Sequence, residues 1–249
     1  MVRRMLVKMT AFLFLFLLIP VSAYAMHIME GFLPIGWAVL WAVIALPFIV
    51  LGVVRINKLV KESPNIKMLL ALAGAFVFVL SALKLPSVTG SCSHPTGVGL
   101  SAILFGPTVT SVLGLIVLVF QAILLAHGGI TTLGANVFSM AIAGPIIAFL
   151  VYKTIKGTGG SNAVAVFFSA ALGNLFTYIV TAVQLALAFP DPIRGFAASL
   201  GKFMTVFAVT QIPLAISEGI LTVVIFNILY AYNNKELQQL KVLSKEMRI

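Results

Sequence analysis

The sequence predicts an all-α fold, a bundle of helices that crosses a membrane several times, and three observations support this. Hydrophobic residues make up 61% of the 249 residues and charged residues only 9%, whereas a soluble domain carries about a quarter charged residues. The mean hydropathy is +1.15. Several apolar stretches are as long as the roughly 20 helical residues that cross a hydrocarbon core of about 30 Å.

The charge of the chain indicates contact with a lipid bilayer rather than with a nucleic acid. The formal net charge is +10, from 16 Lys and Arg against 6 Asp and Glu. In so apolar a chain the basic residues are interpreted by position, because short loops rich in Lys and Arg stay on the cytoplasmic side. The single cysteine, Cys92, excludes a disulfide framework within one chain and a thiolate-rich metal cage.

Residues 1–25 have the three parts of a secretory signal peptide. A basic head is followed by an apolar run over 11–19, and Ala23 and Ala25 match the A-x-A cleavage pattern. We expect cleavage after Ala25, which makes Met26 the first residue of the mature chain. The alternative is an uncleaved first transmembrane helix.

Six apolar stretches have the length of a membrane-spanning helix: 36–54, 68–83, 99–126, 131–152, 163–189 and 203–232. The stretch 99–126 is too long for one perpendicular span at about 1.5 Å per residue, and Gly106-Pro107 marks a break inside it. We therefore expect 95–105 to form a short or re-entrant helix, which gives about seven spans in the mature chain. The organisation is then a signal peptide (1–25), a transmembrane domain (26–232) and a cytoplasmic tail (233–249) that forms a solvated helix end.

Seven spans with the mature N-terminus outside agree with the distribution of basic residues. Only Lys84, Arg194 and Lys202 then lie outside. The inner loops and the cytoplasmic C-terminus hold Arg55, Lys58, Lys61, Lys67, Lys153, Lys156, Lys235, Lys241, Lys245 and Arg248. This arrangement satisfies the positive-inside rule and predicts a multi-pass protein of the inner cell membrane.

The new N-terminus is a candidate metal chelator, because a free α-amine would stand directly before a histidine. The Met26 amine, the His27 backbone amide and the His27 imidazole Nδ1 can close two adjoining chelate rings, which puts three nitrogens in one plane. Planar nitrogen donors suit Ni(II), Cu(II) and low-spin Co(II). Zinc prefers a tetrahedron, and magnesium or calcium prefer oxygen. A fourth donor in the plane is still needed.

His94 is the candidate for that fourth donor, because its glycine- and proline-containing loop lies on the same outer face. Alternatively, His94 is a surface or interface histidine with a hydrogen-bonding role. His127, before two glycines, is expected to cap a turn or to support the ligands rather than to bind the metal itself. Glu30 can orient the chelate, offset the charge of the cation, or be an interfacial carboxylate.

Glu218 stands near the middle of the last apolar stretch. A carboxylate within a membrane is costly and is therefore a functional hypothesis by default. At about 1.5 Å per residue, Glu218 lies roughly 20 Å below the outer end of its helix. This depth favours a structural hydrogen bond, to Asn174 or Gln184, over contact with the metal.

Four stretches carry a family resemblance: Met-His-Ile-Met-Glu-Gly-Phe-Leu-Pro at 26–34, Ser-His-Pro-Thr-Gly at 93–97, His-Gly-Gly-Ile-Thr-Thr-Leu-Gly-Ala-Asn at 127–136 and Gln-Ile-Pro-Leu-Ala-Ile-Ser-Glu-Gly at 211–219. With these the sequence resembles the CbiM/NikM family, the metal-capturing S components of energy-coupling-factor uptake transporters. The resemblance implies seven helices and a mature N-terminal segment that inserts into the bundle. It assigns the metal ligands to Met26, His27 and His94. Residues expected to support these ligands are Glu30, Ser93, His127 and Asn136.

The same resemblance implies partners and a cargo. The partners are a transmembrane scaffold (T) subunit, a pair of ATP-binding-cassette ATPases and a small auxiliary membrane subunit. The Met-Glu-Gly at 29–31 looks more like the cobalt branch than the nickel branch. The leading hypothesis is therefore capture of Co(II), as transported ligand rather than cofactor, for cobalamin biosynthesis. Nickel is the alternative within the family.

Two hypotheses from other classes stay open at this stage. A membrane-embedded metalloenzyme is disfavoured, because the sequence has neither H-E-x-x-H nor G-x-S-x-G. A purely structural scaffold predicts no bound metal. The chain also lacks a G-x-x-x-x-G-K-[ST] phosphate loop, so ATP hydrolysis is expected on a separate subunit.

Overall fold

A computed structural model describes residues 24–25, 27–86, 91–240 and 242. Most of the predicted signal peptide and the predicted ligand Met26 lie outside the described residues. The predictions of cleavage and of an amine ligand therefore stay predictions.

Helices make up most of the described chain, which confirms the all-helical class. They are α2 (Ile35–Glu62), α3 (Ile66–Ala82), α4 (Val98–Phe105), α5 (Pro107–Leu125), α6 (Leu133–Asn136), the π-helical segment η2 (Val137–Ala143), α7 (Gly144–Gly157), α8 (Asn162–Ala188), α9 (Gly195–Tyr232) and α10 (Asn234–Gln239). Apolar composition over about 20 residues located most of these helices. The helices extend beyond the apolar stretches where polar turns continue them, as at the basic end of α2.

The predicted break at Gly106-Pro107 is confirmed. Gly106 ends α4 with a φ of +85°, a conformation that favours glycine, and Pro107 is the first residue of α5. All eight residues of α4 are buried. A helix of eight residues is about 12 Å long, which is too short to cross a membrane.

Within the described chain, five helices or continuous helical runs are long and apolar enough to cross a membrane: Ile35–Glu62, Pro107–Leu125, Leu133–Gly157, Asn162–Ala188 and Gly195–Tyr232. The apolar α3 is shorter. The expected total of seven spans and the sides of the two termini stay predictions. The last run, α9, continues unbroken through Pro213 and at 38 residues is about 57 Å long.

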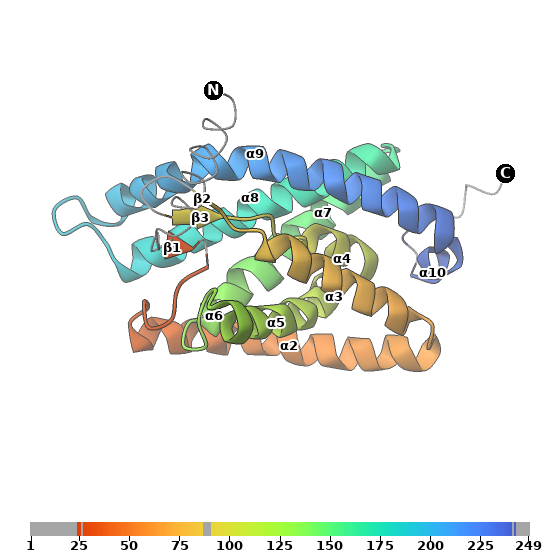
Figure 1. The fold of residues 1–249 in the computed structure, drawn as a ribbon, viewed down its shortest axis with the longest axis horizontal. Helices are drawn as coiled ribbons and strands as arrows, with labels where there is room; N and C mark the ends of the chain where they lie inside the picture. The colour runs from red at the N-terminus through yellow and green to blue at the C-terminus, as the bar shows by residue number, and fades with distance from the viewer. Residues whose placement is uncertain (1–23, 26, 87–90, 241, 243–249) are drawn as a thin grey trace, which may run out of the picture.

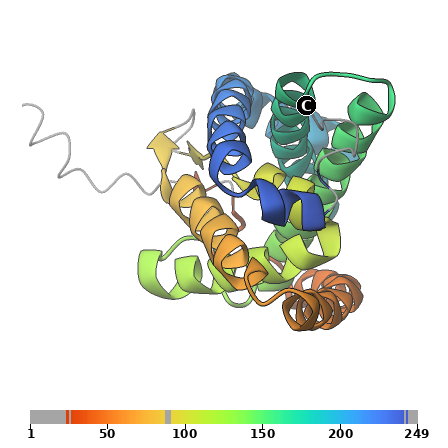
Figure 2. The ribbon, with the colours of Figure 1, turned by 90° about the vertical axis from the view of Figure 1, so that its right-hand side faces the viewer.

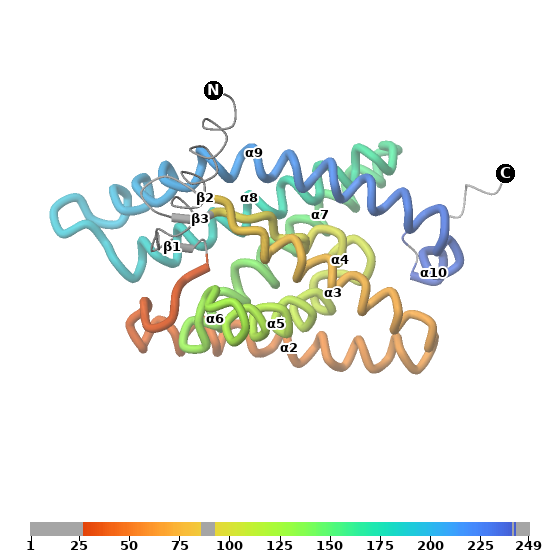
Figure 3. Tube along the Cα trace, viewed as in Figure 1, coloured from red at the N-terminus to blue at the C-terminus, as the bar shows by residue number. Residues whose placement is uncertain are grey.

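The helices form two outer layers with shorter elements between them (Figures 1 and 3). Long helices α8 and α9 pack side by side on one side of the molecule. Helix α2 lies on the opposite side, and α4 and α5 lie between. Many side chains of α2 are exposed, for example Val43 and Val54, as expected for a helix that faces lipid.

The C-terminal segment packs against the bundle (Figure 2). Leu237 of α10 and Val242 are buried in the same hydrophobic cluster as Leu100 of α4. The Tyr152 hydroxyl donates a hydrogen bond to the carbonyl of Val242 (3.1 Å). The expectation of a fully solvated tail is therefore wrong for these residues, because apolar side chains spaced within the charged segment reach the core.

A small three-stranded sheet lies near the start of α4. Strand β3 (Ser91–Ser93) is central, parallel to β1 (Tyr24–Ala25) and antiparallel to β2 (Leu85–Pro86). The pairing of Ala25 with Cys92 places the end of the predicted signal peptide beside the chain that leads to His94.

Candidate metal centre

Three histidines from three separate parts of the chain converge at one buried point. His27 precedes α2, His94 precedes α4, and His127 follows α5. Their relative exposures are 3%, 0% and 1%, and one ligand nitrogen from each lies within 4.8 Å of the others. The rings of His27 and His94 stack with centroids 4.5 Å apart, and His127 stands edge-on to both.

The hydrogen bonds of His94 indicate which of its nitrogens is free to bind a metal. His94 Nδ1 lies 2.8 Å from the carbonyl oxygen of Pro95, so we assign the ring proton to Nδ1. The lone pair is then on Nε2, which lies 3.1 Å from His27 Nδ1. Two nitrogens on adjacent corners of a planar site are about 2.8 Å apart when each metal–nitrogen bond is about 2 Å. The observed separation is close to that value.

The orientation of His27 is fixed from its other side by Met140. His27 Nε2 lies 3.2 Å from the sulfur of Met140, a weak acceptor for a ring N–H. This leaves Nδ1, the atom required by the predicted chelate, facing His94. Met140 belongs to the π-helical segment η2, and such segments are frequent at functional sites. Sequence reasoning missed Met140, because a lone methionine in an apolar stretch carries no signal.

Burial keeps all three imidazoles neutral. It lowers the pKa of His94 to about 4 and that of His127 to about 2. The pKa of His27 is also well below its usual range, because the ring is buried and because His94 and His127 lie beside it. Neutral imidazoles can donate a lone pair to a metal without first losing a proton.

The segment that carries His27 is held by polar side chains of the region around α6. The Asn136 side chain accepts a hydrogen bond from the Ile28 N–H (2.8 Å) and donates one to the Ile28 carbonyl (3.0 Å). The Thr132 hydroxyl donates to the same carbonyl (2.6 Å). Ile28 and Leu33 are buried in a hydrophobic cluster with Tyr178 of α8, so the segment is inserted into the bundle.

Two glycines after His127 allow the same segment to pass close by. Gly128 has a φ of +77°. A Cβ on Gly129 would lie 2.4 Å from the Cα of Glu30, so only glycine fits there. The exposed Glu30 carboxylate accepts hydrogen bonds from the Ile130 and Thr131 amides. Hydrogen bonds from the Thr131 side chain and from these amides hold the pKa of Glu30 below its usual value.

The loop that carries His94 is held by α9. The Ser93 and Thr210 hydroxyls are hydrogen bonded (2.7 Å), and the Gln211 side chain donates to the His94 carbonyl (3.3 Å). Ser93 therefore touches the helix behind the loop and supports the position of the next residue, His94.

Glu218 fastens the rest of this loop. Its buried carboxylate accepts hydrogen bonds from the Thr96 N–H (2.6 Å), the Thr96 hydroxyl (2.9 Å), the Gly97 N–H (2.8 Å) and the Asn174 side chain (2.5 Å). The predicted hydrogen bond to Asn174 is confirmed. The alternative partner Gln184 is wrong, because Gln184 donates instead to the Ala135 carbonyl.

His127 lies inside the cluster rather than serving as a cap. Neither of its buried ring nitrogens has a hydrogen-bond partner in the described part of the chain, so the ring does not cap the turn. Its two nitrogens are available to whatever occupies the centre. Of the other predicted residues, Asn136 and Ser93 contact the segments that carry His27 and His94, and Glu30 lies at the surface.

Comparison with known proteins assigns the chain to a family. A family model described as the cobalt uptake substrate-specific transmembrane region matches residues 27–236. The chain belongs to the CbiM family. A protein from Clostridioides difficile named cobalt transport protein CbiM is 62% identical, over 91% of this chain and 91% of that protein. One of the same name from Nostoc sp. is 64% identical, over 90% of this chain and 86% of that protein.

A solved structure shares the CbiM fold described above. It is described as the crystal structure of a transition metal transporter, and it superposes with a TM-score of 0.72 at 23% identity. The match covers 84% of this chain and 94% of that chain. This CbiM-family protein is therefore a multi-pass membrane protein, the transmembrane component of a cobalt uptake system, and it is a transporter component rather than an enzyme.

Proposed function

We propose that the three-histidine cluster captures Co(II) at the outer face of the membrane. The observation that supports this most is the pairing of His27 Nδ1 with His94 Nε2 at 3.1 Å, with both rings buried and neutral. These two atoms would occupy adjacent corners of the four planar nitrogen donors. The cobalt name of the relatives favours cobalt over nickel as cargo.

The remaining two donors of the plane are the Met26 amine and the His27 amide, formed after cleavage behind Ala25. The amide shares one chelate ring with His27 Nδ1, and the amine shares the adjoining ring with the amide, so covalent geometry keeps both close to that atom. The family model begins at residue 27, which supports a mature chain that starts close to this point. The proposed ligands are therefore Met26, His27 and His94.

His127 is the proposed fifth donor, perpendicular to the plane. Its ring stands edge-on to both other rings, and its nitrogens lack partners among the described residues. A planar Co(II) ion can accept such an axial nitrogen. Ser93, Asn136 and Glu30 would act on the metal only through the segments that they hold.

Transport is proposed to depend on other subunits of an energy-coupling-factor system. The family resemblance supports a T subunit, an ATPase pair and a small auxiliary membrane subunit as partners, and cobalamin biosynthesis as the use of the ion. No phosphate loop is present in the sequence, which agrees with ATP hydrolysis on a separate subunit.

Uptake of radioactive Co(II) by cells tests this function. Cells with this chain and its partner subunits should accumulate cobalt, and the variant His27→Ala should not. Cobalt bound by the purified mature chain, with no chemical turnover of any substrate, would distinguish capture from catalysis. A purified mature chain without affinity for cobalt or nickel would contradict the proposal and support a structural role.

A further inference from the structure

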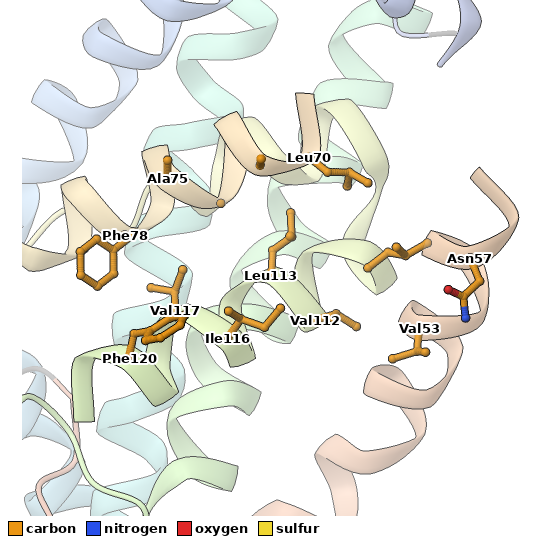
Figure 4. Close-up of a pocket in the computed structure, with 13 residues that line it drawn as sticks. Val53, Asn57, Leu70, Ala75, Phe78, Val112, Leu113, Ile116, Val117 and Phe120 are labelled. Carbon is orange, nitrogen blue, oxygen red and sulfur yellow. The ribbon is translucent and has the colours of Figure 1, made fainter. Parts of the chain in front are cut away.

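An apolar groove lies between α2 and α3, and no histidine of the cluster lines it (Figure 4). Its volume is about 560 Å³. Val53 of α2 and Gly74 of α3 belong to its walls, and Leu113 and Val117 of α5 line its base. Asn57 is the one polar residue among those that line it. Such a groove on an intramembrane surface accommodates hydrocarbon.

The groove opens toward lipid rather than toward the interior. Ile116 and Phe120 line it and are 47% and 51% exposed. Helix α2, which forms one wall, is mostly exposed along its length. A hydrocarbon chain from the surrounding bilayer can therefore enter from the side.

One end of the groove is basic on both walls. On α2, Lys61 follows Asn57 by four residues and Val53 by eight, so all three share one face. On α3, Lys67 precedes Ala71 by four residues and shares its face. A second hollow shares Asn57 with the groove, and its other lining residues are Val54, Lys58, Lys61 and Glu62.

The two lysines are free to bind an anion. Both are exposed, and neither forms a salt bridge with another described residue; Glu62 pairs with Lys58 instead (3.9 Å). The short turn between α2 and α3 brings both lysines to the same end of the groove. Two cations at the end of an apolar groove match the phosphate of a lipid with a net negative charge.

The length of the groove matches one leaflet. On α3 the groove is lined from Leu70 to Phe78, and Lys67 lies one turn before Leu70, eleven positions from Phe78. This corresponds to about 16 Å of helix, compared with about 15 Å for half of a hydrocarbon core. An acyl chain can thus lie along the groove while its headgroup stays at the level of the lysines.

We propose that this groove is a binding site for an anionic phospholipid, with an acyl chain against α3 and α5 and the phosphate bound by Lys61 and Lys67. The lipid fills the space between α2 and α3, because these two helices touch each other at few points although α2 packs on α5. It stabilises the position of α2 in the membrane. This site is independent of the proposed metal capture.

Native mass spectrometry of the full chain in mild detergent tests the site. The probes are palmitoyl-oleoyl phosphatidylglycerol and the zwitterionic palmitoyl-oleoyl phosphatidylcholine. The wild-type chain should retain phosphatidylglycerol at least tenfold better. The double variant Lys61→Gln/Lys67→Gln should lose this preference, whereas the matched variant Lys153→Gln/Lys156→Gln on α7 should keep it.

A second pair of variants tests the groove itself. A side chain at Gly74 points at Leu113 with room for a larger group, since a Cβ there meets the Leu113 side chain at 3.8 Å. Gly74→Leu should fill the groove and reduce bound phosphatidylglycerol at least fivefold, whereas Gly36→Leu, in open space at the start of α2, should not. Equal retention of the two lipids by the wild type would overturn the proposal. Unchanged phosphatidylglycerol binding in Gly74→Leu would also overturn the proposal and would indicate that a helix of a partner protein occupies the groove.

Discussion

Residues 27–31 and residues 93–97 each bring one histidine to the same cluster, but different chemistry holds each segment. The first is held by neutral groups, the Asn136 amide and the Thr132 hydroxyl, and by the exposed Glu30. The second is held by the fully buried carboxylate of Glu218.

The difference follows from what each backbone offers. The first segment presents both the N–H and the carbonyl of Ile28, and a side-chain amide can pair with both. At Thr96 and Gly97 the second segment presents donors. The two oxygens of a carboxylate can accept all of them. The N-terminal arm, residues 27–31, is thus held by neutral partners, whereas the His94 loop is bound to α9 by a carboxylate.

Acidification should affect the amine donor of the N-terminal segment far more than the imidazole donors. Burial holds the pKa of His27 well below its usual range and lowers the pKa of His94 to about 4, so protons do not compete with the metal for these imidazoles in the neutral range. The Met26 amine has a reference pKa of about 7.7 to 8, and protons compete for it throughout the neutral range. Capture should therefore weaken as pH falls, by about fortyfold between pH 8 and pH 6 from competition at the amine alone.

Equilibrium dialysis with radioactive cobalt across this pH range measures the effect. A constant affinity down to pH 5 would show that the imidazoles bind the ion without the amine. The His94→Ala variant should keep the same pH slope at a lower affinity, since the amine contributes equally in both proteins.

Loss of His94 itself should be the largest effect of a single substitution in the loop. His94→Ala removes one of four planar donors, and binding should weaken at least a hundredfold, roughly 3 kcal/mol. The fold should persist, because Glu218 still holds Thr96 and Gly97. Isothermal titration with Co(II), alongside the thermal midpoint in detergent, checks both statements. Affinity within threefold of wild type would remove His94 from the ligand set.

Glu218→Gln should weaken capture ten- to hundredfold without touching the metal, the range typical of residues that orient ligands. The new side-chain NH₂ would face backbone donors, so the loop and His94 would shift. The same titration measures this effect. Thr222→Val is a matched control, because the Thr222 hydroxyl bonds the Glu218 carbonyl within the helix and does not reach the loop. Wild-type affinity in Glu218→Gln would show that Glu218 does not position His94 for the metal.

Gly129→Ala should weaken capture about tenfold by displacing the N-terminal arm. The added Cβ would lie 2.4 Å from the Glu30 backbone, so the N-terminal arm must move. Gly157→Ala, with open space around its Cβ, provides the control. If both variants bind cobalt like the wild type, the arm does not occupy the position described here.

Glu30→Gln should have the smallest effect, less than threefold on affinity. Glu30 is exposed, and a glutamine oxygen can still accept the Ile130 N–H. Titration at low and moderate salt checks this. A tenfold loss that disappears at high salt would show that the carboxylate acts on the cation through its charge.

Much of the fold could be predicted because lipid imposes simple rules. Apolar runs located the helices, and Gly106-Pro107 located the break between α4 and α5. The packing of the tail was missed, since Leu237, Leu240 and Val242 stand among charged and polar residues in a short segment. Local composition does not reveal such long-range contacts.

The site was predictable only where chemistry is local. The chelate of His27 with a new amine could be predicted from adjacent residues. The loop that carries His94 could be predicted from its glycines and Pro95. The positions of His127 and Met140 depend on how distant helices pack, so sequence spacing could not provide them. The hydrogen bond between Glu218 and Asn174 was predictable, because a buried carboxylate requires a donor.

Cobalt stoichiometry of processed and unprocessed chains tests the proposed metal site most directly. The purified chain that begins at Met26, identified by mass spectrometry of its N-terminus, should bind one Co(II) with the absorption spectrum of a low-spin ion that has four planar nitrogen donors and one axial nitrogen. The chain that retains residues 1–25, produced with Ala23 and Ala25 replaced to block cleavage, should bind at least a hundredfold more weakly. Equal binding by the two chains would contradict a site built on the Met26 amine.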